Sequence, residues 1–526
     1  MRRMLVEAAG PVAFLVLSLA LYAPSFGNPL VWDDQIHIEQ ARTSGLRQLL
    51  GRTEGQYRRP LVLLSYHLQW RAGVATPASF HLMNALLHGI NGALLYLVLV
   101  RLGLGIAVAG PACAVFIAHP LQSAAVAYVS GRSDLLAVLF TLAALYVVLG
   151  AVAASERRAA AACIAVALAV VLAGAAKESG LVAGPLVAGL WCVVATTRQW
   201  HRPLLPASAL AAAAITAAWV YPPALGQALQ LGLATRLRAA GTTLLTDVRL
   251  LVAPVGLHLD RLTPTGGVLS LLAGLGVAAA IGWIVLRALA RPRELTVRRF
   301  GVLALAMSYA PVSNLVPVYP AIADRWVFTP EHFLYAPLAA LAALASAGIA
   351  RVFSSPVALA GRQRSGLAAA AVAAAVVMLS IVPVRARQSR LADAETVYRD
   401  TLAHSPSPRA CFNLGVTLLT GERYDEAVET YERCTTISPN DAGVYAQLGA
   451  AYQQAHRPAE AAMAYERAVG LDPGNALAWS NYASLDAQSG AYEAARTKWR
   501  KALSLDPALM PARRGLEQLG RLDPAR

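Results

Sequence analysis

The sequence is poor in charged residues. Asp, Glu, Lys and Arg make up only 14% of its 526 residues, while 57% are hydrophobic. Soluble domains carry roughly a quarter charged residues, so this composition excludes an ordinary soluble enzyme and predicts a chain that lies mostly in a membrane. Apolar runs recur too often for a single signal peptide. The first run ends at Tyr22-Ala23-Pro24, which lacks a small-residue cleavage site. We therefore predict a retained helix, with a cleaved signal as the alternative.

Cysteines are scarce as well, with five in the chain. Cys113, Cys163 and Cys192 lie in apolar runs, and the spacing of the five fits no metal site. Cys411 and Cys434 lie in a polar region and pair only if that region faces an oxidising compartment. We favour two buried thiols there.

The net charge is +15, which by itself suggests a nucleic-acid partner. The basic residues instead cluster in short loops between apolar runs, which is the positive-inside pattern of membrane proteins. We therefore predict a cytoplasmic N-terminus and no nucleic-acid partner. The predicted inward arginines are Arg101, Arg157, Arg158, Arg198, Arg202, Arg291, Arg293, Arg298, Arg299, Arg351, Arg362 and Arg364.

Eleven apolar segments could span a bilayer, and this odd number predicts a C-terminus outside the cell membrane. They are residues 7–25, 81–100, 103–118, 134–153, 160–176, 179–197, 204–222, 266–290, 299–319, 333–350 and 366–384. The fold class expected is all-α. A polytopic helix bundle over residues 1–385 precedes a helical repeat domain over residues 386–526.

The repeat domain has a period of 34 residues. Pro439, Pro473 and Pro507 follow this period, as do Ala427, Ala461 and Ala495. Small residues where two helices cross, with Pro after the second helix, are the tetratricopeptide signature. Three repeats cover about residues 408–509. Residues 391–406 are predicted to be the second helix of an earlier repeat, and residues 512–520 a capping helix.

Two long loops face outward in this topology, residues 28–80 and 223–265. Residues 227–252 have apolar side chains at helical spacing and predict a helix lying along the membrane interface. The polar residues of all outward segments form one candidate site. They are Asp33, Asp34, Arg58, Arg59, His119, Arg132, Asp134, Lys177, Glu178, Arg249, His258, Asp260, Arg261, Asp324, Arg325, Glu331, His332 and Tyr335.

Ionisable groups at the ends of membrane helices are costly unless they are paired or functional. Lys177 and Glu178 are compatible with a structural ion pair. Arg132 and Asp134 are compatible with the start of a helix. His119, which precedes Pro120, is compatible with a turn. Asp33-Asp34 favours a function, because one cap needs only one carboxylate. Two adjacent carboxylates raise one another's pKa or hold a cation between them, so they suit a general base or a metal-assisted variant with a divalent cation.

Acids and cations together at one membrane face suit sugar transfer from a polyprenyl-phosphate carrier. The cations bind the phosphate, and a carboxylate takes the proton of an acceptor hydroxyl while the sugar's anomeric carbon is inverted. The alternative is a non-catalytic membrane scaffold for assembling cell-envelope complexes. The concave repeat surface would bind a protein acceptor in the first case and an assembly partner in the second.

Several segments occur in an order that resembles one family. They are "LVWDDQIHI", "YRRPLVLLSYHLQW", "FHLMNALLHGINGALLYLVLVRL", "AHPLQSAAVAYVSGRSDLLAVLF", "AKESG", "DVRLLVAPVGLHLD" and "EHFLYAP". In this order they are similar to the transmembrane and tetratricopeptide-repeat-containing protein O-mannosyltransferases and their bacterial relatives. The resemblance covers nearly the whole chain, repeats included.

This resemblance implies a GT-C glycosyltransferase fold, a catalytic acid in the first outer loop and a lipid-phosphate sugar donor. The family's acidic pair matches Asp33-Asp34, and Asp33 is the expected base. The family's Glu-Arg before "LYLP" matches Glu331-His332 before "LYAP", so His replaces Arg here. The Ala- and Arg-rich composition indicates a bacterial chain from a high-GC genome, which places it in the cytoplasmic membrane with the repeats outside.

Overall fold

The computed structural model describes residues 2–50, 59–151, 156–195, 204–220, 232–290, 297–315, 326–353 and 362–522. It confirms the predicted all-α class, since the described residues form helices with only two three-residue strands. The chain divides into two compact units, Met1–Asp393 and Ala394–Arg526. Residues 386–393, which we assigned to the repeat domain, lie in the first unit because helix α17 continues to Arg390.

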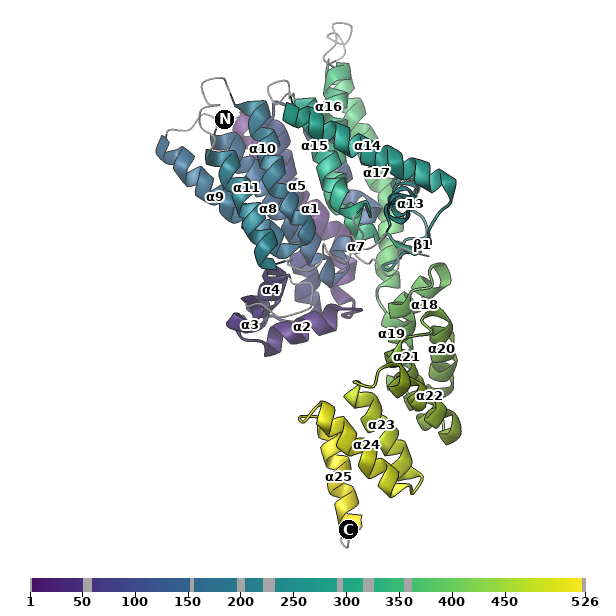
Figure 1. Cartoon of the computed structure of the whole chain (residues 1–526). Coiled ribbons are helices and arrows are strands. Elements are labelled where there is room, and N and C mark those ends of the chain that lie inside the picture. Colours follow the sequence, from purple (N-terminus) through teal and green to yellow (C-terminus); the bar gives the residue numbers. More distant parts are fainter. Residues whose placement is uncertain are drawn as a thin grey trace. The chain divides into compact units, whose positions relative to one another are not determined.

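The first unit is a helix bundle (Figure 1). Its α-helices are α1 (Arg2–Tyr22), α2 (Asp34–Thr43), α3 (Leu46–Leu50), α4 (Pro60–Arg71), α5 (Pro77–Arg101), α6 (Ile106–Ala118), α7 (Ser123–Val126), α8 (Arg132–Ala151), α9 (Glu156–Ala176), α10 (Ala183–Val194), α11 (Leu204–Val220), α13 (Leu233–Val252), α14 (Val268–Ala290), α15 (Val297–Tyr309), α16 (Tyr335–Phe353) and α17 (Arg362–Arg390). The predicted interfacial helix corresponds to α13, and the part of that prediction before residue 232 lies outside the described residues.

Within the described part of the chain, fewer helices are long and apolar enough to span a bilayer than the eleven that we predicted. Among the described residues, six are long and apolar enough: Gly10–Gly27, Pro77–Arg101, Val129–Ala151, Arg157–Ala176, Val268–Ala290 and Ala370–Arg390. The pair Ile106–Ala118 and Pro120–Val126, bent by 51°, would be a seventh. The prediction failed because turns interrupt the apolar runs. Proline at 120 and short 3₁₀ turns η4 (Glu178–Val182) and η6 (Ala310–Val312) leave helices shorter than a span.

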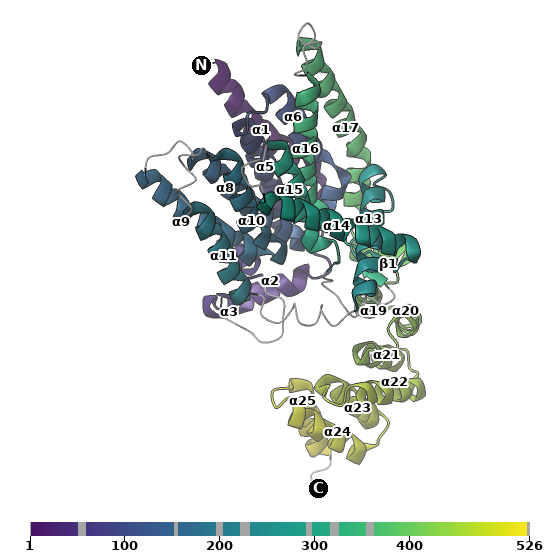
Figure 2. The same ribbon diagram turned by 45° about the horizontal axis from the view of Figure 1, so that its top comes forward.

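These interruptions lie at one end of the bundle. The ends of α6 and α9 and the start of α8 meet there through η2 (Pro120–Gln122), η3 (Val129–Gly131) and η4. Helices α2 and α3 lie across the same end, and the N-terminus lies at the other, as both views show (Figures 1 and 2). Next to this end, α8 to α11 enclose an apolar core that includes Val148, Val170 and Leu190. The fold thus gathers irregular backbone and polar side chains at one end of an apolar bundle.

A two-stranded antiparallel sheet lies at this end beside α13. Strand β1 (Leu262–Pro264) pairs with β2 (Trp326–Phe328), and Leu262 lies opposite Phe328. A short 3₁₀ turn, η7 (Glu331–Leu334), follows β2 and leads into α16. The sheet therefore joins the two predicted outer segments around residues 260 and 331.

The second unit is a stack of helix pairs. Its helices are α18 (Ala394–His404), α19 (Pro408–Thr420), α20 (Tyr424–Ile437), α21 (Ala442–Gln454), α22 (Pro458–Leu471), α23 (Ala476–Gln488), α24 (Tyr492–Leu505) and α25 (Met510–Leu522). In two of the helix pairs, α19 with α20 and α21 with α22, a glycine meets an aromatic ring. A Cβ atom on Gly415 would lie 2.3 Å from Tyr431, and one on Gly449 would lie 2.7 Å from Tyr465. This close approach is the physical reason for the 34-residue period, and it confirms the tetratricopeptide prediction.

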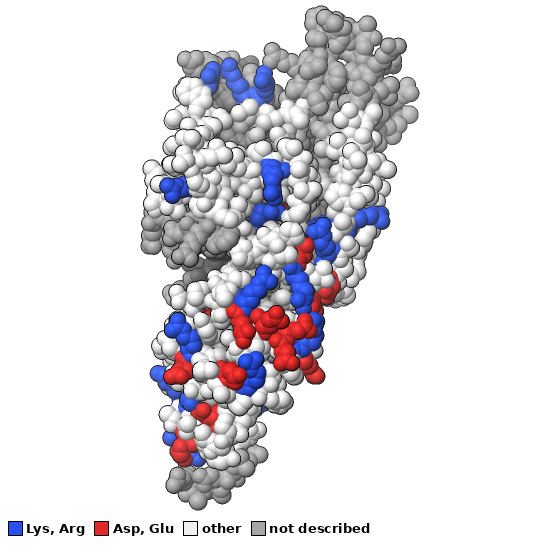
Figure 3. Space-filling view, turned by 90° about the vertical axis from the view of Figure 1, so that its right-hand side faces the viewer, with Lys and Arg blue, Asp and Glu red and all other residues white. Residues whose placement is uncertain are grey.

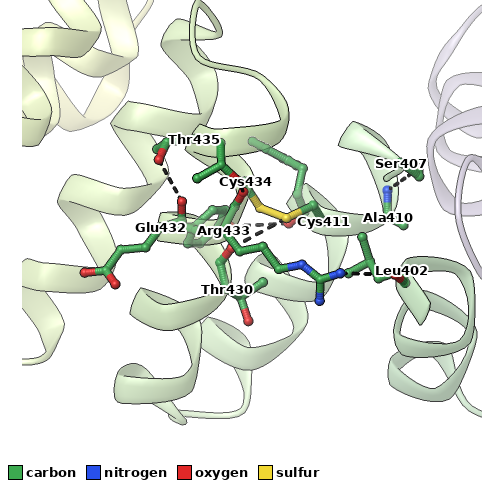
Figure 4. The surroundings of a disulfide bond; sticks show 12 residues. Leu402, Ser407, Ala410, Cys411, Thr430, Glu432, Arg433, Cys434 and Thr435 are labelled. Carbon is green, nitrogen blue, oxygen red and sulfur yellow. Dashed lines mark hydrogen bonds between the residues drawn. A yellow bond between two sulfur atoms is a disulfide. The ribbon is translucent and has the colours of Figure 1, made fainter. Parts of the chain in front are cut away.

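Cys411 of α19 and Cys434 of α20 form a disulfide in the first repeat, with Cα atoms 5.6 Å apart (Figure 4). Our preference for two buried thiols was therefore wrong. The repeat packing brings the two side chains together from helices that cross closely, which the 23-residue separation in sequence does not reveal.

Exposed charges of the second unit form a closed ring of ion pairs. Arg399 and Arg423 each contact both Glu395 and Glu426, at 2.6 to 3.0 Å. Acidic side chains on the face drawn in Figure 3 gather on this unit. Because α18 supplies Glu395 and Arg399, the ring joins α18 to the first complete repeat. Each exposed pair contributes at most about 1 kcal/mol.

Candidate functional site

The acid pair lies on a strained turn. Trp32 is buried and has a φ of 61°, in the left-handed region that bulky residues rarely adopt. Such a conformation costs on the order of 1–3 kcal/mol and persists only where the surroundings hold it. Asp33 is the N-cap residue of α2 and Asp34 its first residue. The surroundings that hold Trp32 in this conformation therefore also hold the two carboxylates at the start of α2.

The Asp34 side chain is buried, and both of its carboxylate oxygens accept hydrogen bonds from the protein. Its Oδ1 accepts from the Ser130 amide at 2.7 Å and from the Ser130 hydroxyl at 2.6 Å, and its Oδ2 accepts from the Val31 amide at 3.2 Å. Burial raises the pKa of Asp34 to about 7. Asp34 thus fastens the loop to η3.

Asp33 is only half-buried, so its carboxylate is the more accessible of the two. His37 lies one helical turn further on and donates its amide to the Asp33 carbonyl at 3.0 Å. Its Nδ1 hydrogen-bonds to the Ser130 hydroxyl at 3.2 Å. Burial lowers the pKa of His37, which favours the neutral imidazole. The opening of the site therefore presents one accessible carboxylate beside a neutral histidine.

A chain of alternating charges leads away from this turn. Arg59 contacts the Ser133 hydroxyl at 3.4 Å and the Glu178 carboxylate at 3.3 Å. The Arg59 side chain remains 30% exposed. Next to Glu178, Lys177 donates to both oxygens of Asp134, at 2.7 and 2.8 Å, in a pair buried from solvent. Arg59 is thus the accessible cation, whereas Lys177 is neutralised inside.

Arg132 lies in the protein interior with no exposed surface. Its guanidinium donates to four neutral acceptors, namely Asn84 Oδ1 at 2.9 Å, Ser65 Oγ at 3.2 Å, Gln69 Oε1 at 2.5 Å and the Phe80 carbonyl at 3.1 Å. It also lies 4.5 Å from the ring centre of Tyr66. Arg132 therefore joins α4, α5 and α8, and burial places it out of reach of a lipid phosphate.

Glu331 and Tyr335 are also buried supports. Glu331 accepts from the His258 amide at 2.7 Å, from Arg261 at 2.9 Å and from Arg387 at 3.3 Å. It joins η7 to the segment before β1 and to the end of α17. The Tyr335 hydroxyl contacts His88 Nδ1 at 2.7 Å and accepts from Asn91 at 3.0 Å.

The remaining predicted residues take other positions. His119 accepts from the Leu121 amide at 3.3 Å and caps η2. The ring of His332 packs on Phe333, with centres 4.9 Å apart. Arg249 is exposed on α13. Arg58 lies outside the described residues, as do Asp324 and Arg325.

Sequence reasoning missed several supporting residues. Asn84, His88 and Asn91 of α5 were not singled out, although spacings of four and three place them on one face of an apolar helix. Polar side chains in such a helix are a signal that we overlooked. Ser130, which binds Asp34, carried no signal in the sequence. Among the described residues, no three His, Cys, Asp or Glu side chains are grouped to hold a metal ion.

Comparisons with known proteins support part of this organisation. The tetratricopeptide repeat family matches residues 379–442 and 447–509. Protein O-mannosyl-transferase Tmtc1 of Drosophila melanogaster is 31% identical over 146 residues, which are 24% of this chain and 17% of that protein. Protein O-mannosyl-transferase TMTC3 of Mus musculus is 35% identical over 86 residues, which are 16% of this chain and 9% of that protein. Each match thus spans less than a fifth of the relative's length.

Solved tetratricopeptide structures resemble about a quarter of the chain. The Sgt2 tetratricopeptide domain of Aspergillus fumigatus is 22% identical and covers 22% of this chain and 80% of its own, with a TM-score of 0.22. MamA is 21% identical over 25% of this chain and 78% of its own, with a TM-score of 0.24. With the family match and the apolar helices, the chain is a tetratricopeptide-repeat-containing membrane protein that is similar, over part of its length, to protein O-mannosyl-transferases.

Proposed function

We propose that the chain is a membrane glycosyltransferase that transfers a mannose-like sugar from a polyprenyl-phosphate carrier to a protein hydroxyl at the outer membrane face. The observation that carries this proposal is an apolar groove between α5, α8, α10, α15 and α16, with a cavity volume of about 90 Å³. We call it the carrier groove. Its lining includes Leu99, Leu142 and Phe300 deep in the bundle and Asp134 and Ser179 at the polar end. The apolar lining suits contact with a prenyl chain, with the carrier phosphate at the polar end.

The accessible charges at that end have the chemistry that the transfer needs. Arg59 is the described cation that remains partly exposed near the acid pair, and a guanidinium binds phosphate through two parallel hydrogen bonds. Asp33 is the accessible carboxylate, so it takes the proton of the acceptor hydroxyl. The hydroxyl oxygen then bonds to the anomeric carbon as the bond to the carrier phosphate breaks, which inverts that carbon. Asp34, Arg132 and Glu331 hold the surrounding backbone in place.

Two features support an outward-facing site. Among the described residues, Arg101, Arg157 and Arg158 lie at the ends of α5 and α9 away from the site, in keeping with the positive-inside pattern. The Cys411–Cys434 disulfide in the repeats fits an oxidising compartment. For a bacterial chain that compartment is the outer side of the cytoplasmic membrane. The repeats would bind the acceptor protein in an extended form.

The test is transfer by the purified full chain in vesicles, with polyprenyl-phosphate mannose and a nucleotide-linked mannose offered separately. We expect mannose to reach serine or threonine of a secreted acceptor from the lipid donor alone, with inversion. Replacing Ala340 with Phe narrows the carrier groove and should raise the KM for the lipid donor more than it lowers kcat. Transfer from the nucleotide donor, or none from either, would contradict the proposal.

A further inference from the structure

Helices α15 and α16 form a wall with a groove on each side. The carrier groove uses one face of the wall, made by Phe300, Gly301, Ala304, Ser308, Ala336, Ala339, Ala340 and Ala343. The opposite face, which includes Leu305, Tyr309 and Leu338, lines a second apolar groove with a cavity volume of about 540 Å³. Helices α13 and α14 complete this second groove, which we call the α13 groove.

The α13 groove is lined by one carboxylate among the described residues. Asp247 of α13 and Tyr309 of α15 are its polar lining side chains within the described part of the chain. The Tyr309 hydroxyl donates to Asp247 Oδ2 at 3.0 Å. Oδ1 accepts no hydrogen bond from the residues that the structure describes, although Asp247 is only 6% exposed. A carboxylate oxygen in apolar surroundings is costly to leave without a donor.

The charge at the polar end determines which lipid each groove suits. The carboxylate that lines the carrier groove, Asp134, is paired with Lys177, and the partly exposed Arg59 lies nearby on Glu178. The carboxylate that lines the α13 groove, Asp247, accepts only from the neutral Tyr309 hydroxyl among the described residues, so it favours a hydrogen-bond donor with a positive charge. Burial raises the pKa of Asp247 to about 7, so an approaching cation would stabilise its charged form.

We propose that the α13 groove binds a bilayer phospholipid with a primary ammonium head group. The ammonium donates to Asp247 Oδ1, and the acyl chain lies along α14 and α16. Helix α13 supports this placement because it is amphipathic, with exposed apolar residues such as Leu245 and Val252 that suit the membrane interface. The acyl chain follows the small residues Ala273, Gly276 and Ala280 on α14.

Small residues on α14 allow a matched pair of variants. A Cβ atom added at Gly276, which lines the groove, or at Gly282, which is outside its lining, would meet nothing within 4 Å. Gly276→Leu therefore fills the groove with little strain, while Gly282→Leu adds the same side chain to the same helix elsewhere. For the head group, Asp247→Asn removes the charge, and Tyr309→Phe removes only the hydroxyl that Asp247 already uses.

The experiment is native mass spectrometry of the full chain taken from bilayers of equal phosphatidylethanolamine and phosphatidylglycerol. We expect the wild type, Gly282→Leu and Tyr309→Phe to retain phosphatidylethanolamine in preference. Asp247→Asn should lose this preference by about tenfold, and Gly276→Leu should retain neither lipid in the groove. Equal retention of both lipids by the wild type, or an unchanged preference in Asp247→Asn, would overturn the proposal. Retention by Gly276→Leu equal to that of Gly282→Leu would overturn the location.

Discussion

Lys177 donates to both carboxylate oxygens of Asp134, at 2.7 and 2.8 Å, in a pair that is almost closed to solvent. The pair joins the end of α9 to the start of α8 at the polar end of the bundle. Two further supports, the Asp34–Ser130 and Arg132–Asn84 contacts, lie on the same short stretch around residue 131. The segment between α6 and α8 is thus held by charged side chains from several elements.

Replacing Lys177 with Ala should be strongly destabilising, because it leaves Asp134 buried without its counter-charge. Breaking one partner of a buried pair costs about 3–5 kcal/mol. Thermal unfolding of the purified chain measures this loss, and Lys501→Ala, at an exposed position of α24, is the matched control. Pairing Lys177→Met with Asp134→Leu should recover most of the stability. An unfolding temperature unchanged in Lys177→Ala would show that the pair does not support the fold.

Arg132→Lys should fail to replace arginine although it keeps the charge. A lysine ammonium has three donors on one nitrogen, whereas the guanidinium reaches four acceptors in separate directions. We expect a loss of about 2–4 kcal/mol in the free energy of unfolding, from acceptors left without donors. Urea unfolding measures it against Arg249→Lys at an exposed site. Equal stability of the two variants would argue against the buried role.

The buried carboxyl of Asp34 should make stability depend on pH. Its folded pKa, about 7, lies above the value of about 4 for an unfolded aspartate, so the folded chain binds the proton more tightly. The contribution of Asp34 is therefore fully present below about pH 4 and decreases as pH rises through about 7. Relative to Asp34→Asn, the wild type should lose about 1 kcal/mol between pH 6 and pH 8. If the free energies of unfolding of the wild type and of Asp34→Asn changed equally between pH 6 and pH 8, the raised pKa of Asp34 would be contradicted.

Reduction of the Cys411–Cys434 disulfide should loosen the first repeat. A disulfide between residues 23 positions apart removes conformational entropy from the unfolded chain. This raises the free energy of the unfolded chain by about 3 kcal/mol and so stabilises the fold. Hydrogen exchange of α19 and α20 should increase when reductant is added to the wild type. The Cys411→Ser, Cys434→Ser double variant should show the faster exchange with or without reductant. Protection that does not respond to reductant in the wild type would indicate that the bond is absent from the purified protein.

Periodicity predicted the repeat domain well, because the small residues and aromatic rings that recur every 34 positions are the packing contacts themselves. The spans were less predictable. Hydrophobicity measures the composition of a segment, but the turns at Pro120, Glu178 and Ala310 decide whether a helix is long enough to cross a bilayer.

The candidate site was predictable in its residue types and less so in their positions. Charged residues such as Arg132, Lys177 and Glu331 were found because they stand out in an apolar chain. Their burial follows from partners such as Asn84 and Ser130, which are brought close only by tertiary packing. In the sequence, Asp33 and Asp34 cannot be told apart. In the structure, the turn that begins at Trp32 leaves the Asp33 carboxylate accessible and buries that of Asp34.

The most direct test of the proposed function is sugar transfer by Asp33→Asn. The variant keeps the size of the side chain and removes the base, while Gln35→Ala on the exposed side of α2 serves as control. The measurement is the rate of mannose transfer from polyprenyl-phosphate mannose to an acceptor protein in vesicles, together with binding of the lipid donor. We predict that Asp33→Asn binds the donor but transfers at least about 100-fold more slowly than the wild type and Gln35→Ala. Transfer by Asp33→Asn at the wild-type rate would contradict the account.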